Sequence, residues 1–201
     1  MKKEYPKCFA HMVGKSVARK RQLLKHIPGV MDCKSMLYIG ANPRRFELMD
    51  LFWAEAPQLK VDVLEAWANN VDGLNGLNAK YGIFNNILHG DIRQFADVER
   101  SGDEMEFLGE WDVVMFWHGP EHLYIDEHEP VLEAIEGMAK KYVILGCPWG
   151  KFPQKNVGGN PFEEHKSVLY PQDFRYFGYA TDTIKKPDKR GGHILAWKEM
   201  S

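Results

Sequence analysis

The chain has 201 residues, of which 44% are hydrophobic and 27% are charged, a composition that supplies one sizeable core and excludes a disordered chain. Its formal net charge is −2 at pH 7, so the molecule as a whole has no field that would attract nucleic acid or an anionic membrane. No apolar run approaches the roughly 20 residues of a membrane span, and no secretory signal is visible, so we expect a cytoplasmic protein. Cys8, Cys33 and Cys147 are far apart, which indicates reduced thiols.

Short apolar runs alternate with helix-like stretches along most of the chain. Continuous apolar runs between helices are typical of parallel strands buried on both faces of a sheet. The final two β-rich runs, joined by a charged turn, predict an antiparallel hairpin at the edge of that sheet. The predicted helices are 15–26, 44–56, 66–80 and 130–140, and the predicted strands are 35–40, 61–65, 83–89, 111–117, 142–146, 176–183 and 193–198.

This pattern predicts an α/β fold, with a doubly wound, Rossmann-like, mainly parallel sheet of seven strands and helices on both faces. No repeat or flexible linker divides the chain, so we expect a single domain over residues 1–201 with a helical extension at 1–34. Charge is uneven, because residues 1–30 carry eight Lys or Arg against one Glu, and residues 94–136 carry thirteen Asp or Glu against one Arg. Two solvated faces explain this more simply than a docking surface for an acidic partner.

Polar or turn-forming residues stand where four predicted strands end, which is where ligands bind in an open parallel sheet. Gly40 ends the first strand and lets the backbone approach a ligand, with the amides of the following helix facing an anion. Glu65 ends the second strand, where a carboxylate can accept hydrogen bonds from both hydroxyls of a ribose. Asp91 and Ile92 follow the third strand, where they can meet an adenine. Each residue alone has an ordinary explanation as a turn or a helix cap.

In this order the segments resemble class I S-adenosylmethionine (SAM)-dependent methyltransferases, over nearly the whole chain. LYIGA resembles the first motif of the family, VDVLEAW its acidic second-strand motif, GDI its adenine-side motif and WDVVMFWHGPEHL its fourth-strand motif. The late stretch HKSVLYPQDFRYFGYATDTI also resembles members of that family. The resemblance implies SAM as the cofactor, contacted by Gly40, Ala41, Asn42, Glu65, Ala66, Asp91, Ile92, Trp117 and His118.

By the same resemblance, Gly40 lies against the methionine part of the cofactor and Glu65 holds the ribose. Asp91 and Ile92 then frame the adenine. Trp117 and His118 flank the transferable methyl group. The acceptor is expected to be a small molecule or a sugar-like group, while the sequence leaves its identity and the oligomeric state open.

The loop after the first strand departs from the family, which usually has a glycine-rich GxGxG pattern. Only Gly40 remains, before Ala41, Asn42 and Pro43. Asn42 can adopt a left-handed conformation and Pro43 suits the first turn of a helix, so the loop can survive in altered form. Weak or lost cofactor binding would make the chain a non-catalytic binding or scaffold protein. An oxidoreductase with a nucleotide cofactor is disfavoured by the single glycine and the antiparallel ending.

Methyl transfer to a hydroxyl requires alignment of the acceptor and removal of a proton. His118, directly after the fourth predicted strand, is the first candidate base, and the others are Glu121, His122 and His165. HGPEH matches the spacing of an inverted zinc-protease motif, but its Gly-Pro pair disfavours the helix that motif requires, so no metal is expected. VGKS at 13–16 lacks the first glycine of a phosphate-binding loop.

The irregular segment 147–165 follows the fifth predicted strand and has three glycines and three prolines. A long loop near strand ends often covers a substrate, and an ordered surface connection is the alternative. Trp149, Phe152 and Phe162 are its expected anchors in either case.

Overall fold

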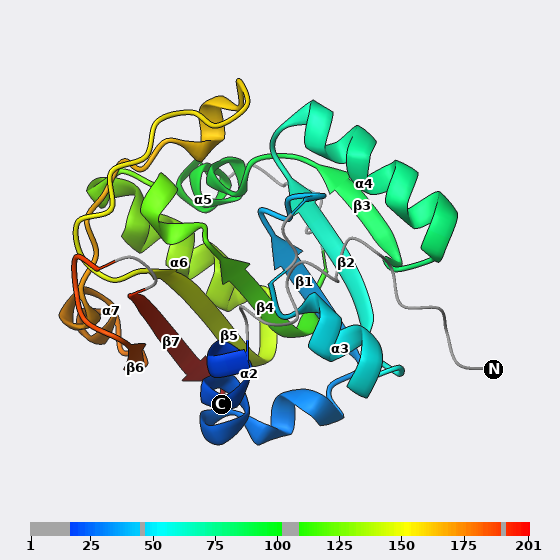
Figure 1. Cartoon of the computed structure of the whole chain (residues 1–201), viewed down its shortest axis with the longest axis horizontal. Helices are drawn as coiled ribbons and strands as arrows, with labels where there is room; N and C mark the ends of the chain where they lie inside the picture. Colours follow the sequence, from blue (N-terminus) through cyan, green and yellow to red (C-terminus); the bar gives the residue numbers. More distant parts are fainter. Residues whose placement is uncertain (1–16, 45–46, 102–108, 190–191) are drawn as a thin grey trace.

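The computed structural model describes residues 17–44, 47–101, 109–189 and 192–201 (Figure 1). Within this part of the chain, no helix is long and apolar enough to cross a membrane. The strands are β1 Ser35–Ile39, β2 Lys60–Glu65, β3 Asn86–His89, β4 Trp111–Trp117, β5 Ala139–Pro148, β6 Ala180–Ile184 and β7 His193–Glu199. The α-helices are α2 Val17–His26, α3 Met49–Glu55, α4 Ala68–Tyr81, α5 Ile92–Ser101, α6 His128–Gly137 and α7 Pro171–Tyr176, and short 3₁₀ helices are η1 Pro28–Asp32, η2 Pro120–His122, η3 Ile125–Glu127 and η4 Pro161–Glu163.

One seven-stranded sheet has the order β3-β2-β1-β4-β5-β7-β6. The first five strands in this order pair in parallel, while β7 runs antiparallel to both β5 and β6. The predicted doubly wound, Rossmann-like sheet with an antiparallel C-terminal hairpin is confirmed. Strand order reverses between β1 and β4, so the fold opens a ligand-binding crevice where these two strands end.

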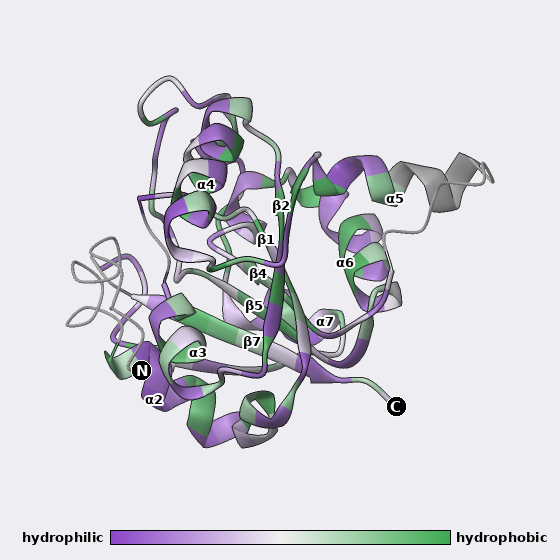
Figure 2. Cartoon of the chain, turned by 90° about the vertical axis from the view of Figure 1, so that its right-hand side faces the viewer, coloured by the Kyte–Doolittle hydropathy of each residue, from purple (hydrophilic) through white to green (hydrophobic). Residues whose placement is uncertain are grey.

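Helices cover both faces of the sheet, and Figure 2 shows it nearly edge-on with α2, α3 and α4 on one side and α5, α6 and α7 on the other. Alternation along β1 produces this sandwich, because successive strand side chains point to opposite faces. Met36 and Tyr38 pack into the core that includes residues of α2, α3 and α4. Leu37 and Ile39 pack into the core that includes residues of α5, α6 and α7.

The first described helix, α2, differs in detail from the prediction. Its first residue, Val17, is 41% exposed, whereas Leu23 and Ile27 are buried. Its basic residues do not form a purely solvated face, since Arg19 pairs with Glu47 and Lys20 with Asp50, near the start of α3. The VGKS stretch and Cys8 lie outside the described residues.

The segment after β1 contains the largest error of the sequence prediction. Helix α3 begins at Met49 rather than at residue 44, after Leu48 in a left-handed conformation with φ of 70°. Pro43 therefore lies in a turn and does not begin a helix, and no helix start directly follows Gly40. Instead Pro43 packs on α4. A Cβ added to Gly73 of that helix would lie 2.9 Å from Pro43 Cγ.

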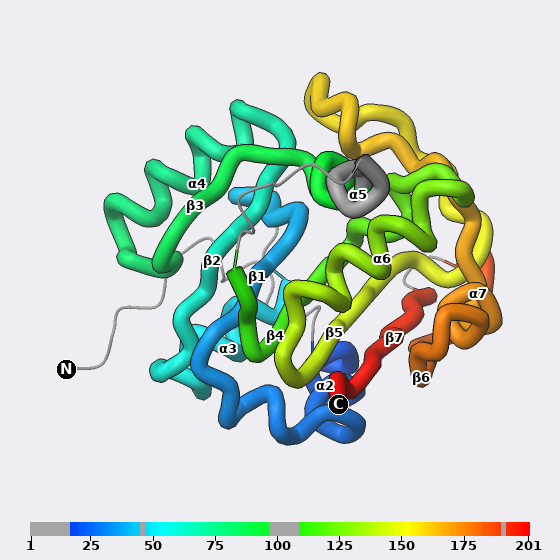
Figure 3. Tube along the Cα trace, turned by 180° about the vertical axis from the view of Figure 1, so that it is seen from behind, coloured from blue at the N-terminus to red at the C-terminus, as the bar shows by residue number. Residues whose placement is uncertain are grey.

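The last third of the chain ends in the predicted hairpin with a shifted start. Tyr176 belongs to α7, and β6 begins only at Ala180. The following strand, β7, inserts between β5 and β6, as the tube view from behind shows (Figure 3). Cys33 and Cys147 are buried free thiols, as predicted.

Candidate functional site

A cleft opens where β1, β2 and β4 end, and we call it the strand-end cleft. It encloses about 730 Å³ of space free of protein atoms, part of it open to solvent. Gly40, with φ of 76°, turns the chain at its floor, and its amide donates to the Leu64 carbonyl at 2.8 Å. The cleft is lined by Ile39, Gly40, Leu64, Glu65, Ala66, Asn70, Gly90, Asp91, Ile92, Arg93, Phe116, His118, Gly119, His122, Leu123, Asn160, Pro161, Phe162, Glu163 and Lys166.

Glu65 is the buried acid of this cleft, at the end of β2. Its Oε1 accepts hydrogen bonds from the Trp67 amide at 2.9 Å and from Asn70 Nδ2 at 3.2 Å, while Oε2 has no hydrogen-bond partner within the described residues. Burial raises the pKa of Glu65 to about 7, although these two hydrogen bonds act in the opposite direction. A carboxylate held on one oxygen and open to the cleft on the other is suited to accept from ligand hydroxyls.

The third strand end presents Asp91 and Ile92 to the same cleft. Arg93 donates to the Asp91 carboxylate through Nε at 3.1 and 3.0 Å and through Nη2. This contact raises the pKa of Arg93. Arg93 also lies against the Phe162 ring, 5.8 Å from its centroid. The Asp91 carboxylate thus has a fixed partner that the sequence prediction did not include.

Two residues from the predicted cofactor set lie elsewhere. The Trp117 side chain does not line the strand-end cleft, since it is buried in the core on the α2 side and donates from Nε1 to Glu47 at 3.1 Å. Gly146 of the neighbouring strand makes room for the indole, because a Cβ there would lie 2.4 Å from it. Ala41 is fully buried in the same core. The expectation that Trp117 flanks a methyl group in the cleft does not agree with this placement.

A second cavity, which we call the histidine cavity, meets the strand-end cleft at Gly40, His118, His122 and Glu163. Asn42 lines this cavity rather than the first, and its Nδ2 donates to Glu163 Oε1 at 3.1 Å. The lining residues are Arg19, Gly40, Asn42, Glu47, His118, Glu121, His122, Pro148, Phe152, Gln154, Glu163, His165 and Gly192.

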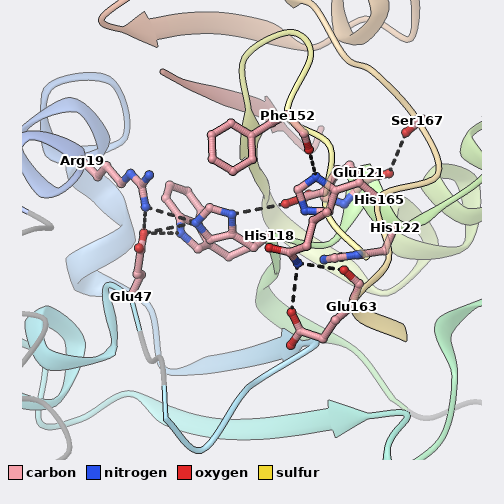
Figure 4. Close-up of polar contacts among 12 residues, drawn as sticks. Arg19, Glu47, His118, Glu121, His122, Phe152, Glu163, His165 and Ser167 are labelled. Atoms are coloured by element: carbon pink, nitrogen blue, oxygen red, sulfur yellow. Dashed lines mark hydrogen bonds and ion pairs between the residues drawn. The ribbon is translucent and has the colours of Figure 1, made fainter. Parts of the chain in front are cut away.

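His118 lies between the two cavities in a left-handed conformation with φ of 53°. Its Nδ1 lies 3.2 Å from Glu121 Oε1, and its Nε2 lies 3.1 Å from Arg19 Nη1 (Figure 4). Its Nε2 also lies 3.4 Å from Glu47 Oε2. The imidazole is therefore held between two carboxylates and one guanidinium.

Arg19 and Glu47 complete this network, and the sequence analysis missed both. Burial lowers the pKa of Arg19 to about 10 despite the nearby charge of Glu121. Glu47 Oε2 accepts from Arg19 and from the Trp117 indole. Behind them His193 is fully buried, its ring 5.5 Å from that of His118, and burial together with the charges of Arg19 and His118 holds its pKa well below the usual value.

Glu121, His122 and His165, the other predicted catalytic residues, gather in the histidine cavity. One ligand atom from each lies within 4.8 Å of the others. Burial opposes ionisation of Glu121, but the hydrogen bond with His118 and the charge of His122 outweigh it, so its pKa is lowered. Burial lowers the pKa of His165.

The predicted covering segment 147–165 contributes to the walls of both cavities. Of its expected anchors, Trp149 packs against the core on the α5 side, whereas Phe152 is 37% exposed. Asn160 is also buried, and its side chain accepts a hydrogen bond from the Phe162 amide at 2.9 Å at the start of η4. A second attachment comes from Gly150, which forms an antiparallel bridge with Leu169.

The sheet order and the strand-end cleft define the Rossmann-like fold of class I SAM-dependent methyltransferases. Solved structures of this fold include an O-methyltransferase family protein from Burkholderia thailandensis, which has a TM-score of 0.58 and 13% identity over 96% of this chain and 61% of its own. The N-terminal domain of EvdMO1 with SAH bound has a TM-score of 0.60 and 15% identity, over 92% of this chain and 80% of its own. A SAM-dependent methyltransferase from Clostridium acetobutylicum has a TM-score of 0.60 and 10% identity, over 94% and 96% of the two chains.

The chain spans 61% and 54% of the length of the first two methyltransferases that match it. No protein-family model matches the chain, and no curated protein matches its sequence. The similarity in structure shows the fold.

Proposed function

We propose that the protein is a SAM-dependent methyltransferase that transfers a methyl group to a hydroxyl of a small-molecule or sugar-like acceptor. The observation that carries this proposal is Glu65, buried at the end of β2 with Oε2 open to the strand-end cleft. The two hydroxyls of a ribose are donors of the kind this carboxylate accepts. Ile92 and Leu64 line the apolar part of the same cleft, which suits an adenine ring.

Gly40 lies at the junction of the two cavities, and in this proposal the methyl donor binds in the strand-end cleft and the acceptor in the histidine cavity. Transfer is a displacement in which an acceptor oxygen forms a bond to the methyl carbon while the bond from that carbon to sulfur breaks, leaving S-adenosylhomocysteine (SAH). The hydroxyl proton must leave the acceptor. His118, located at this junction, is the base in this proposal, and it accepts the proton at Nε2 once the contacts of that atom with Arg19 and Glu47 are released.

Calorimetric titration of SAM, SAH and NAD into the purified protein tests the cofactor. SAM and SAH should bind with modest affinity, because the loop after Gly40 has no glycine-rich turn and leads to no helix start. NAD should not bind. Absence of SAM binding at millimolar concentration would refute the proposal and favour the alternative, a non-catalytic binding or scaffold protein.

A screen of hydroxylated acceptors, followed by release of SAH, then tests the transfer. With an acceptor in hand, His118→Ala should lower turnover by about 10² to 10⁴, while the affinity for SAH changes less than about threefold. Equal losses of turnover and SAH affinity would instead make His118 part of the cofactor site.

A further inference from the structure

The cluster of Glu121, His122 and His165 combines residues from two distant parts of the sequence. Glu121 and His122 belong to η2, directly after β4, and His165 follows η4 in the segment 147–165. Their ligand atoms lie within 4.8 Å of one another at the wall of the histidine cavity (Figure 4). A main-chain hydrogen bond holds these two parts of the chain together, since the Lys166 amide donates to the Glu121 carbonyl at 2.8 Å.

Both histidines of the cluster are oriented by main-chain carbonyls. His122 Nδ1 lies 3.1 Å from the Glu164 carbonyl oxygen, and His165 Nδ1 lies 2.5 Å from that of Phe152. A carbonyl oxygen only accepts, so each Nδ1 carries a hydrogen, and neither Nε2 has a hydrogen-bond partner among the described residues. A histidine that binds a metal through one ring nitrogen usually donates the hydrogen on the other nitrogen to a carbonyl or carboxylate oxygen in this way.

The buried carboxylate of Glu121 is a second indication that this cluster binds a cation. Its side chain is only 4% exposed, and Oε1 is occupied by the contact with His118. Oε2 is buried and has no hydrogen-bond partner among the residues that the structure describes. A buried carboxylate oxygen without a partner costs free energy, and a cation bound between it and the two imidazoles would remove that cost.

We propose that Glu121, His122 and His165 bind a divalent transition-metal ion, with Zn²⁺ as the best match. Two imidazoles and one carboxylate are a ligand set typical of catalytic zinc, which keeps a further position open. The proposed site differs from the HGPEH zinc motif, because it uses His122 and His165 rather than His118 and His122. His118 Nδ1 is already in contact with Glu121. The open position faces the histidine cavity, where the ion can hold an acceptor hydroxyl and favour loss of its proton. This use of the ion, unlike its binding, rests on the proposed methyl transfer.

Metal binding is tested on the full chain after treatment with a chelator and its removal. Titration with Co²⁺ should produce the visible absorption of a four- or five-coordinate ion at one equivalent, and Zn²⁺ should displace it. His122→Ala, His165→Ala and Glu121→Gln should each weaken binding of both ions at least tenfold. His89→Ala is the matched control, because its exposed imidazole also contacts a main-chain carbonyl, that of Ala66 at 3.1 Å, yet lies outside the cluster.

Circular dichroism shows whether each variant folds. A second measurement uses the unaltered chain, so its result does not depend on the folding of any variant. Zn²⁺ should raise its thermal midpoint and slow proteolysis within 149–165, because the ion would tie this segment to η2. Equal Co²⁺ affinity of the unaltered chain and a folded His165→Ala variant would overturn the proposal, as would absence of Zn²⁺ stabilisation. SAM titration of the metal-free protein separates the two proposals, since Glu65 and not this cluster is expected to hold the cofactor.

Discussion

Replacing Glu65 by Gln should stabilise the unliganded protein at high pH and leave its stability unchanged at low pH. Gln keeps an oxygen acceptor for the Trp67 amide and Asn70 Nδ2 but cannot ionise. The Glu65 pKa is raised from 4.5 to about 7. Below pH 4.5 the folded and unfolded chains both hold the proton, so ionisation has no effect on stability. Between pH 4.5 and 7 the unfolded chain releases it first, and stability falls as the pH rises.

Each pH unit across this window costs about 1.4 kcal/mol, so the full effect of Glu65 reaches about 3 kcal/mol above pH 7. Urea denaturation at pH 4.5 and pH 8.5 measures the difference between the unaltered chain and Glu65→Gln at each pH. The variant should be more stable at pH 8.5 only. Glu55→Gln, on an exposed residue of α3, should show no such change. A Glu65→Gln effect of the same size at both pH values would refute the argument from burial.

The same substitution should weaken SAM binding at least tenfold, because two charge-assisted hydrogen bonds are worth about 1.5 to 3 kcal/mol each. Ribose hydroxyls favour the ionised carboxylate, so the affinity of the unaltered chain should rise with pH through about 7. Unchanged affinity in Glu65→Gln would remove Glu65 from the cofactor site while leaving the stability prediction intact.

Two further predictions concern packing and acid stability. Gly73→Ala alone should destabilise the protein in urea denaturation, since the added Cβ meets Pro43 Cγ at 2.9 Å and Pro43 Cβ at 3.1 Å. In a Pro43→Gly background, which removes both atoms, it should stabilise by up to about 1 kcal/mol through helix propensity; a destabilising Gly73→Ala in both backgrounds would contradict this. His193, whose pKa is lowered by burial, binds its proton only in the unfolded chain, so stability should fall as pH drops below about 6.5. His193→Leu should flatten that fall, and an unchanged slope between pH 6.5 and 5 would show that His193 is not its cause.

The strands and their ends were predictable because they follow from local rules. Continuous apolar runs such as 111–117 identify buried parallel strands, and parallel strands end at one edge of a sheet. Gly40, Glu65 and Asp91 therefore line one cleft, as the sequence indicates. Whether they bind the predicted cofactor stays a prediction.

The remainder of the site depends on tertiary contacts that no local pattern contains. Arg19 looked like one basic residue on a surface helix, and only the docking of α2 on the sheet brings it to Glu47 and His118. The start of α3 was misplaced for a local reason, because Asn42 Oδ1 accepts from the Arg44 amide at 2.9 Å and holds a turn where Pro43 suggested a first helical residue.

The position of β7 between β5 and β6 has a consequence for folding during synthesis. It is the last of the seven strands to leave the ribosome, yet it pairs along its length with β5 and along most of it with β6. Until residues 193–199 emerge, β5 is an edge strand with unpaired backbone groups and an apolar sequence, the kind of edge on which nascent chains aggregate. The sheet is therefore complete only after nearly the whole described chain is made. A truncation before His193 should give an insoluble product rather than a smaller folded domain.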